Sequence, residues 1–134
     1  MTFQDIADSL PNGFHDAELK RFEMDYLQRR LRFDFDIWIG DKVHSEMYRA
    51  ATVTLDDVAY LVIEPPEASD PGLDTAAICI DTGPGHLRQS GSILPQAPTG
   101  TSATWMILHD LNRFLLFGAG SASIEWTGPE ENRG

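Results

Sequence analysis

The sequence predicts a mainly β fold: an antiparallel sandwich or a partly open barrel of about seven or eight strands, with a short N-terminal helix. Three observations lead to this prediction. Apolar residues recur with period two along much of the chain, as on strands that bury one face. Turn-forming residues separate these runs at hairpin spacing. A helix-like apolar stripe opens the chain.

Length and composition fit one cytoplasmic domain spanning residues 1–134. A chain of 134 residues is of ordinary single-domain size and can bury a core without disulfides. Its one cysteine, Cys79, lies in an apolar run, where a buried inert thiol is the expected state. The first ten residues carry two aspartates and no basic residue, unlike a signal or transit peptide.

The net charge of the chain indicates which charge a binding partner would carry. There are 21 acidic and 10 basic residues, which gives a formal net charge of -11. Phosphate backbones and anionic lipid surfaces repel such a chain, so we expect neither nucleic-acid nor membrane binding. Seven of the ten basic residues fall within 20–49, so the remainder is strongly acidic. This distribution fits either a basic protein partner or a solvated surface that confers solubility.

The first ten residues form the predicted helix. Thr2 and Asp5 are spaced as a capping pair at its start. Pro11-Asn12-Gly13 supplies a stop and a turn with positive φ. The apolar stripe consists of Phe3, Ile6, Ala7 and Leu10.

Residues 17–39 change to period two and predict a β-hairpin. A turn centred on Gln28-Arg29 would pair Tyr26 with Leu31, and the same register pairs Met24 with Phe33 and Phe22 with Phe35. Another register of the same parity, or a four-residue loop over 27–30, is also compatible. Strict alternation would turn Leu19 outward beside Trp38, unless a bulge at Lys20-Arg21 turns it inward.

Further strands are expected over 46–55, 58–64 and 76–81. The nearly continuous apolar run of 58–64 predicts a central strand buried on both faces. Residues 82–102 hold four glycines and three prolines and predict a long loop.

The stretch 103–117 fits either a helix or two strands, and we favour two strands that turn at 110–112. A tight turn at Ala119-Gly120 would then lead to a last strand ending at Trp126, with Leu115 facing Ile124 and Phe117 facing Ala122. We expect a polar, frayed tail over 128–134.

Gly13-Phe14-His15-Asp16-Ala17, the GFHDA turn, joins the helix to the first strand and holds the first catalytic candidates, His15 and Asp16. A carboxylate beside an imidazole can orient it as a general base or a metal ligand. The structural alternative makes Phe14 a core residue, with His15 bonded to a carbonyl and Asp16 capping loop amides. In either case we expect Phe14 to be buried and Gly13 to have positive φ.

Asp81 is the third catalytic candidate. Asp81-Thr82-Gly83 looks like the active-site triplet of aspartic proteases, in which two carboxylates share a proton, and a homodimer would supply the second Asp81. The alternative is a strand that runs into a turn. The four histidines, His15, His44, His86 and His109, lack short metal-ligand spacing, so we predict no metal site and no cofactor.

The segment Leu10-Pro11-Asn12-Gly13-Phe14-His15-Asp16-Ala17-Glu18-Leu19 resembles a set of small uncharacterised bacterial proteins that begin with a similar His-Asp-Ala turn. The closing segments 112–117 and 122–126 are similar to the C-terminal hairpin of those proteins. In size, acidity and the presence of a His-Asp pair, the chain also resembles immunity proteins of bacterial toxin systems. The resemblance carries no established activity to any residue.

These observations predict a non-catalytic, acidic binding protein, with toxin neutralisation as one form of that function. The alternative is a small hydrolase. It would be of the aspartic type, through Asp81 in a dimer, or would use a site at His15 and Asp16.

Overall fold

The computed structural model of the chain describes residues 1–41, 46–65, 78–85 and 98–134. Its elements are α1 (Phe3–Ser9), β1 (Ala17–Asp25), β2 (Arg30–Trp38), β3 (Met47–Asp56), β4 (Tyr60–Ile63), β5 (Ile78–Pro84), β6 (Ser102–Leu108), the 3₁₀ helix η1 (His109–Leu111), β7 (Arg113–Ala119) and β8 (Ser121–Asn132). The predicted mainly β fold with a short N-terminal helix is confirmed.

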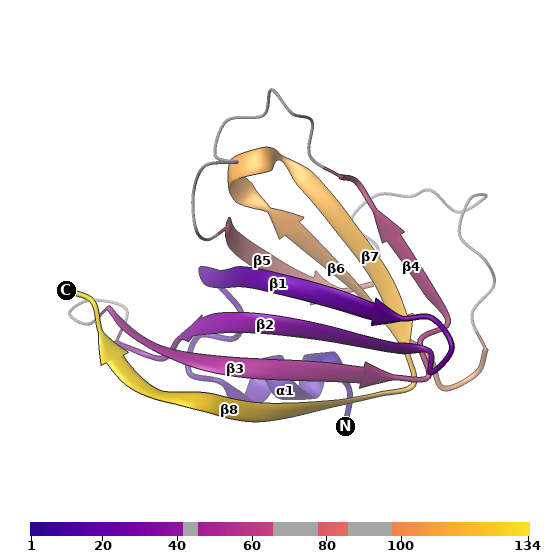
Figure 1. The fold of residues 1–134 in the computed structure, drawn as a ribbon, viewed down its shortest axis with the longest axis horizontal. Coiled ribbons are helices and arrows are strands. Elements are labelled where there is room, and N and C mark those ends of the chain that lie inside the picture. The colour runs from indigo at the N-terminus through magenta and orange to yellow at the C-terminus, as the bar shows by residue number, and fades with distance from the viewer. Residues whose placement is uncertain (42–45, 66–77, 86–97) are drawn as a thin grey trace.

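The eight strands form one open antiparallel sheet in the order β4-β7-β6-β5-β1-β2-β3-β8. Figure 1 shows the group β4-β7-β6-β5 fanning away from the group β1-β2-β3-β8. The groups are joined at β1 and β5 by three residue pairs, Ala17 with Ile80, Glu18 with Cys79 and Leu19 with Ile78. At the opposite end of the strands, the amide of Gly120 donates to the carbonyl of Asp56 and links the β7–β8 turn to the end of β3.

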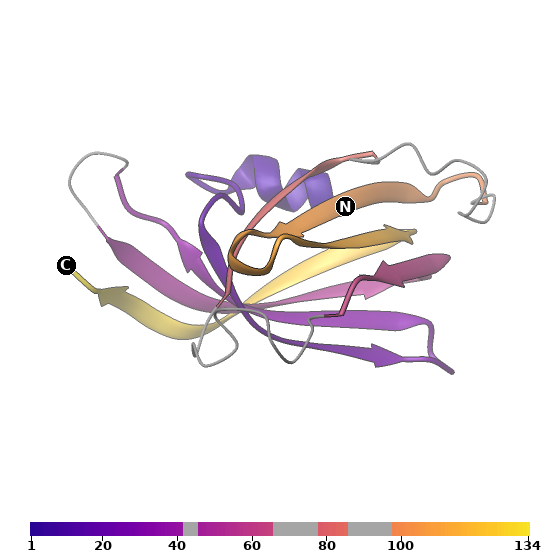
Figure 2. The same ribbon diagram turned by 90° about the horizontal axis from the view of Figure 1, so that it is seen from above.

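Helix α1 lies along one side of the sheet, which we call the inner face (Figure 2). Its start has the predicted capping box: the Asp5 amide donates to Thr2 Oγ1 at 3.1 Å, and the Thr2 amide donates to Asp5 Oδ2 at 2.7 Å. The bond from the Thr2 amide lowers the pKa of Asp5 below its usual value, because it stabilises the carboxylate. The helix buries Phe3 and Ile6 against the sheet.

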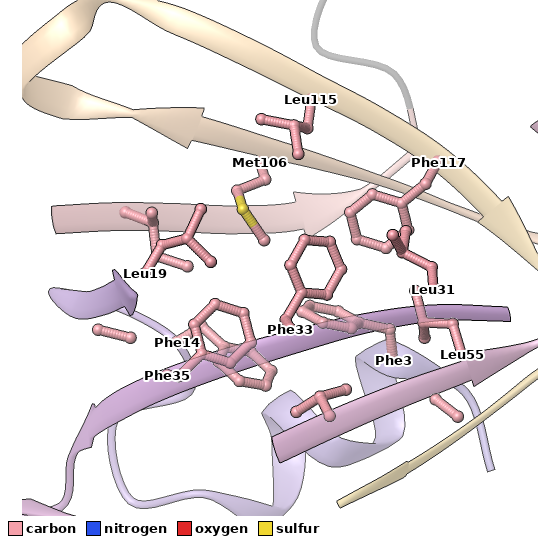
Figure 3. Close-up of a cluster of buried hydrophobic side chains, with 14 of the residues drawn as sticks. Phe3, Phe14, Leu19, Leu31, Phe33, Phe35, Leu55, Met106, Leu115 and Phe117 are labelled. Atoms are coloured by element: carbon pink, nitrogen blue, oxygen red, sulfur yellow. The ribbon is translucent and has the colours of Figure 1, made fainter. Parts of the chain in front are cut away.

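An aromatic cluster fills the core between α1 and the inner face (Figure 3). The ring of Phe14 stacks on Phe3 with centroids 4.5 Å apart and contacts Phe35 at 5.2 Å. Phe117 contacts Phe33 at 5.3 Å. Phe14 is 2% exposed and Gly13 has a φ of 56°, so both predictions for the GFHDA turn are confirmed.

The β1–β2 hairpin forms, but its register differs by two residues from the one centred on Gln28-Arg29. Phe22 pairs with Phe33 and Met24 with Leu31, so the four-residue connection covers 26–29. The Asp25 carboxylate accepts from the Gln28 amide at 3.0 Å, and this contact stabilises the four-residue connection. The expected bulge is present at 19–21, and Leu19 is buried.

Residues 58–64 do not form the central strand that their apolar composition predicted. Strand β4 covers only Tyr60–Ile63 and lies at an edge of the sheet, where it pairs with β7. The side chains of Val62 and Ile63 are partly exposed there, at 37% and 39%. An apolar run indicates a buried strand only when both neighbours are present, and β4 has one neighbour among the described residues.

Residues 103–117 form two strands, as we favoured over a helix, and η1 supplies the turn at 109–111. The predicted pairing of Leu115 with Ile124 and of Phe117 with Ala122 is wrong. Strand β7 pairs with β6 and β4, whereas Ile124 pairs with Val53 and Ala122 with Leu55 of β3. The tail is also more ordered than expected, because β8 continues along β3 to Asn132.

Some expectations fall on segments outside the described residues. These are residues 76–77 of the strand predicted for 76–81 and most of the loop predicted for 82–102. Of that loop, residues 82–84 extend β5, and Ser102 begins β6. Within the described ranges, no helix is long and apolar enough to cross a membrane.

Candidate functional site

The GFHDA turn is held by hydrogen bonds at both ends of its sharp bend. The His15 amide donates to the Asn12 carbonyl at 3.1 Å, and the Ala17 amide donates to the Phe14 carbonyl at 3.1 Å. Asp16 has a φ of 55°, a left-handed conformation that aspartate tolerates better than most residues. Its amide donates to the Ile80 carbonyl at 3.1 Å, which attaches the turn to β5. Phe14 therefore points into the core, while His15 and Asp16 remain at the surface.

Strand β5 carries Asp81 on the face opposite the core. Ile80 is fully buried on the inner face, so the next side chain along the strand projects from the outer face. Asp81 consequently lies beside the GFHDA turn. Its pairing partner on β6 is Ile107, two residues before His109. The topology thus brings together side chains from three sequence-distant segments.

Asp81 contacts two imidazoles, and we call these side chains, with Asp16, the Asp81 cluster (His15, Asp16, Asp81, His109). His15 Nδ1 lies 3.0 Å from both carboxylate oxygens of Asp81. His109 Nε2 lies 3.0 Å from Asp81 Oδ2. On its other side, His15 Nε2 lies 3.4 Å from Asp16 Oδ2. The cluster is open to solvent, with side-chain exposures of 54% for His15, 28% for Asp81 and 42% for His109.

With Asp81 ionised, the contacts assign the donating nitrogen of each ring. An ionised carboxylate only accepts hydrogen bonds, so His15 Nδ1 and His109 Nε2 both donate to Asp81. In a neutral ring the opposite nitrogen keeps a lone pair, which leaves His109 Nδ1 as an acceptor. His15 Nε2 faces Asp16, and only a doubly protonated His15 ring donates to both carboxylates. An imidazole oriented by a carboxylate is the basic component of general acid–base sites.

All three sequence-predicted site residues are thus close together. His15 and Asp16 touch directly, because the left-handed conformation of Asp16 brings side chains together that an extended strand would separate. His15 contacts carboxylates rather than the carbonyl that its structural interpretation predicted. His109 was not among the candidates predicted from the sequence. The pairing of β5 with β6 places His109 near Asp81. The alternation of apolar residues along the sequence does not reveal this pairing.

The Asp81-Thr82-Gly83 triplet lies within regular strand β5, which extends to Pro84. Aspartic-type chemistry needs a second carboxylate that shares a proton with the first. The groups against Asp81 here are two imidazoles. Gly83 has a packing role, since a Cβ at this position would overlap the indole of Trp105 on the neighbouring strand.

A metal site does not emerge from the described part of the chain. No group of three or more histidine, cysteine, aspartate or glutamate side chains there is arranged to hold a metal ion. Two of the four histidines, His44 and His86, lie outside the described residues. The cluster is therefore a hydrogen-bonded set of titratable groups.

The Asp81 cluster has the parts of an acid–base site, and it also ties three elements of the fold together. A fold alone does not determine which of these roles a site has. No family model matches this chain, and no curated protein or solved structure is significantly similar to it.

Proposed function

We propose that this chain is a non-catalytic binding protein whose partner is a basic protein. The observation that carries the proposal is that the described basic side chains are paired within the chain, whereas several acidic side chains are not. Of the ten basic residues, Lys42 and Arg88 lie outside the described ranges, and each of the other eight contacts an acceptor of the chain itself. The positive side chains are therefore occupied within the protein.

The negative side chains are in surplus. Glu125, Glu130 and Glu131 are exposed on β8, and within the described ranges they form no ion pair. Among the described residues, the ion-pair partners of Asp16 and Asp81 are histidines only. Surplus carboxylates create a field that accelerates association with a positively charged protein and repels anionic partners.

The resemblance to immunity proteins of bacterial toxin systems suggests a partner class. Under this proposal the partner is a basic toxin, and binding blocks its action. Acidic residues would supply fast, salt-sensitive association, and apolar contacts would supply the longer-lived part of the complex.

Affinity capture tests the proposal. The purified chain is immobilised and incubated with a bacterial lysate at low salt, and bound proteins are eluted with increasing NaCl. We expect a basic protein that is released as salt screens the charges. The variant with Glu125→Gln, Glu130→Gln and Glu131→Gln should release it at lower salt, whereas Ser123→Ala on the same strand should behave as wild type. Recovery of no basic protein at low salt would contradict the proposal.

A second candidate function is a small hydrolase at the Asp81 cluster. The observation that favours it is the position of Asp81, which orients the imidazoles of both His15 and His109 at 3.0 Å. An oriented neutral imidazole can take a proton from water as that water attacks an ester. The role of general base falls to His109, whose Nδ1 is left as the acceptor.

Ester hydrolysis separates the two candidates. p-Nitrophenyl acetate is a suitable probe, with wild type, Asp81→Asn and His109→Ala compared at equal folded fraction. Loss of at least about a hundredfold in rate for both variants would support the hydrolase, a size typical of the loss of general-base assistance. Glu125→Gln is the matched control for loss of a surface carboxylate. A wild-type rate equal to that of buffer would exclude this esterase activity.

A further inference from the structure

The connection between β1 and β2 displays two large apolar side chains. Tyr26 is 84% exposed and Leu27 is 89% exposed. Among the described residues, only Met1, Phe22, Val62 and Ile63 are other large apolar side chains with substantial exposure. Aromatic and large aliphatic side chains that project together are the usual anchors of protein interfaces.

This hairpin tip is held in one conformation by polar contacts. The Asp25 carboxylate accepts from the Gln28 amide at 3.0 Å. Arg29 has a φ of 50°, its guanidinium contacts Asp57 at 3.0 Å, and its carbonyl accepts from the Val58 amide at 3.0 Å. A tip that is already ordered loses little conformational entropy when it binds.

A hollow of about 440 Å³ lies directly beside the tip. Its lining comes from the β1–β2 hairpin (Met24, Tyr26, Arg29) and from the segment that enters β4 (Val58, Tyr60, Leu61). The volume is within the range of about 300–1,000 Å³ found for binding pockets. Arg29 and Val58 also line a second hollow of about 440 Å³, which extends toward the β7–β8 turn. The tip and the first hollow together form what we call the hairpin-end surface.

The charges around the tip favour a basic occupant. Asp57 pairs with Arg29 and Asp56 pairs with Arg30, whereas Asp25 has no ion-pair partner among the described residues. The tip therefore keeps one net negative charge. The side chain of Asp57 is 74% exposed. A second copy of the chain is a poor occupant, because each copy has a net charge of -11 and the two would repel.

We propose that the hairpin-end surface is the docking site for the basic protein partner. The partner inserts one large apolar side chain into the hollow beside Tyr26, and lysine or arginine residues around that side chain face Asp25, Asp56 and Asp57. Leu27 is a second anchor and packs against an apolar side chain of the partner. The inference rests on the proposed function for the charge of the partner, and it adds the location and the anchor of the complex.

Peptide binding followed by NMR tests this assignment on the full chain. The probes are the pentapeptides KRWRK, KRSRK and EEWEE, added to protein labelled with ¹⁵N. We expect KRWRK to shift the amide signals of 24–29 and 58–61. KRSRK lacks the apolar anchor, and EEWEE lacks the favourable charge, so each should bind at least about tenfold more weakly. Equal binding of KRSRK and KRWRK, or shifts centred on the Asp81 cluster, would overturn the assignment.

Three substitutions sharpen the test. Leu27→Ser removes an exposed anchor, and Ala59→Trp adds bulk at a position that lines both hollows. Both should weaken KRWRK binding at least about tenfold, a typical loss for an interface anchor. Val62→Ser on β4 is the matched control, because Val62 is partly exposed and does not line either hollow. Unchanged melting temperatures would show that the variants remain folded.

The same variants distinguish failure of this inference from failure of the proposed function. If wild type and Leu27→Ser capture the same basic protein equally well, the partner docks elsewhere and this inference is overturned while the proposed function stands. If no basic protein is captured, the proposed function fails. Capture that is lost in Leu27→Ser and Ala59→Trp but kept in Val62→Ser would support the hairpin-end surface.

Discussion

Asp81 Oδ2 and His109 Nε2 lie 3.0 Å apart, although the two residues are 28 positions apart in the sequence. The contact joins β5 to η1, and His15 attaches the GFHDA turn to the same carboxylate. A single aspartate thus links three segments at the surface. Its contribution to stability is limited by exposure, because solvent screens such contacts.

His15→Ala should lower the free energy of unfolding by about 1 kcal/mol or less, since exposed ion pairs contribute about 0–1 kcal/mol. Urea unfolding measures this change. Under the proposed function, partner binding by the folded fraction should be unchanged. A His15→Ala protein with an unaltered melting temperature and no partner binding would make His15 part of the binding site.

Phe14→Ala should cost about 3–5 kcal/mol in the free energy of unfolding, because it removes a buried ring and leaves a cavity. Phe14 stacks on Phe3 from the helix and contacts Phe35 from β2, so the loss affects both elements. Chemical denaturation with an unchanged m-value is the appropriate measurement. Phe14→Leu is the control and should cost less, since it refills part of the space. A cost below about 1 kcal/mol for Phe14→Ala would contradict the role of this ring in packing the helix against β2.

Gly13→Ala should cost on the order of 1 kcal/mol. A Cβ at Gly13 would make only an ordinary contact with the Ala7 carbonyl, so the cost comes from the φ of 56° and not from crowding. Gly13→Asn should cost less, because asparagine tolerates the left-handed region. Thermal unfolding of both variants measures the difference, and equal destabilisation would argue against the conformational explanation.

The Asp5 cap predicts a specific pH dependence. The folded-state pKa of Asp5 is lowered from its usual 3.8 by the hydrogen bond from the Thr2 amide. A lowered folded-state pKa means that the carboxylate stabilises the fold above about pH 4, and that this stabilisation is lost as pH falls through the lowered pKa. The difference in melting temperature between wild type and Asp5→Asn should therefore shrink in acid. A difference that grows as pH falls would contradict the capping role of the carboxylate.

Local pattern was sufficient to predict which strands exist, but it was not sufficient to predict how they pair. The apolar side chains that alternate along β7 can pair with any antiparallel strand whose apolar side chains lie on the same face. Leu115 was therefore matched with Ile124 of β8 instead of Met106 of β6. The observed hairpin register is the alternative of the same parity that the sequence left open. The register centred on Gln28-Arg29 is wrong, because the pattern assigned Tyr26 to a buried strand position. The Asp25 cap and the positive φ of Arg29 place Tyr26 in an exposed turn.

The candidate site was only partly predictable for the same reason. His15 and Asp16 stood out because they are adjacent in a turn, and Asp81 because it follows an apolar strand. His109 has no such local signal. It meets Asp81 through the pairing of Ile80 with Leu108, which is a long-range contact.

Under the proposed function, the surplus negative charge of the chain binds a basic protein. The most direct measurement is the dissociation constant of the captured partner as NaCl is raised from about 0.05 to about 0.5 M, a range in which screening strengthens markedly. The proposed function predicts that affinity falls by about tenfold or more, and that the Glu125→Gln, Glu130→Gln, Glu131→Gln variant binds more weakly at low salt. An affinity that does not change with salt in wild type or variant would contradict it.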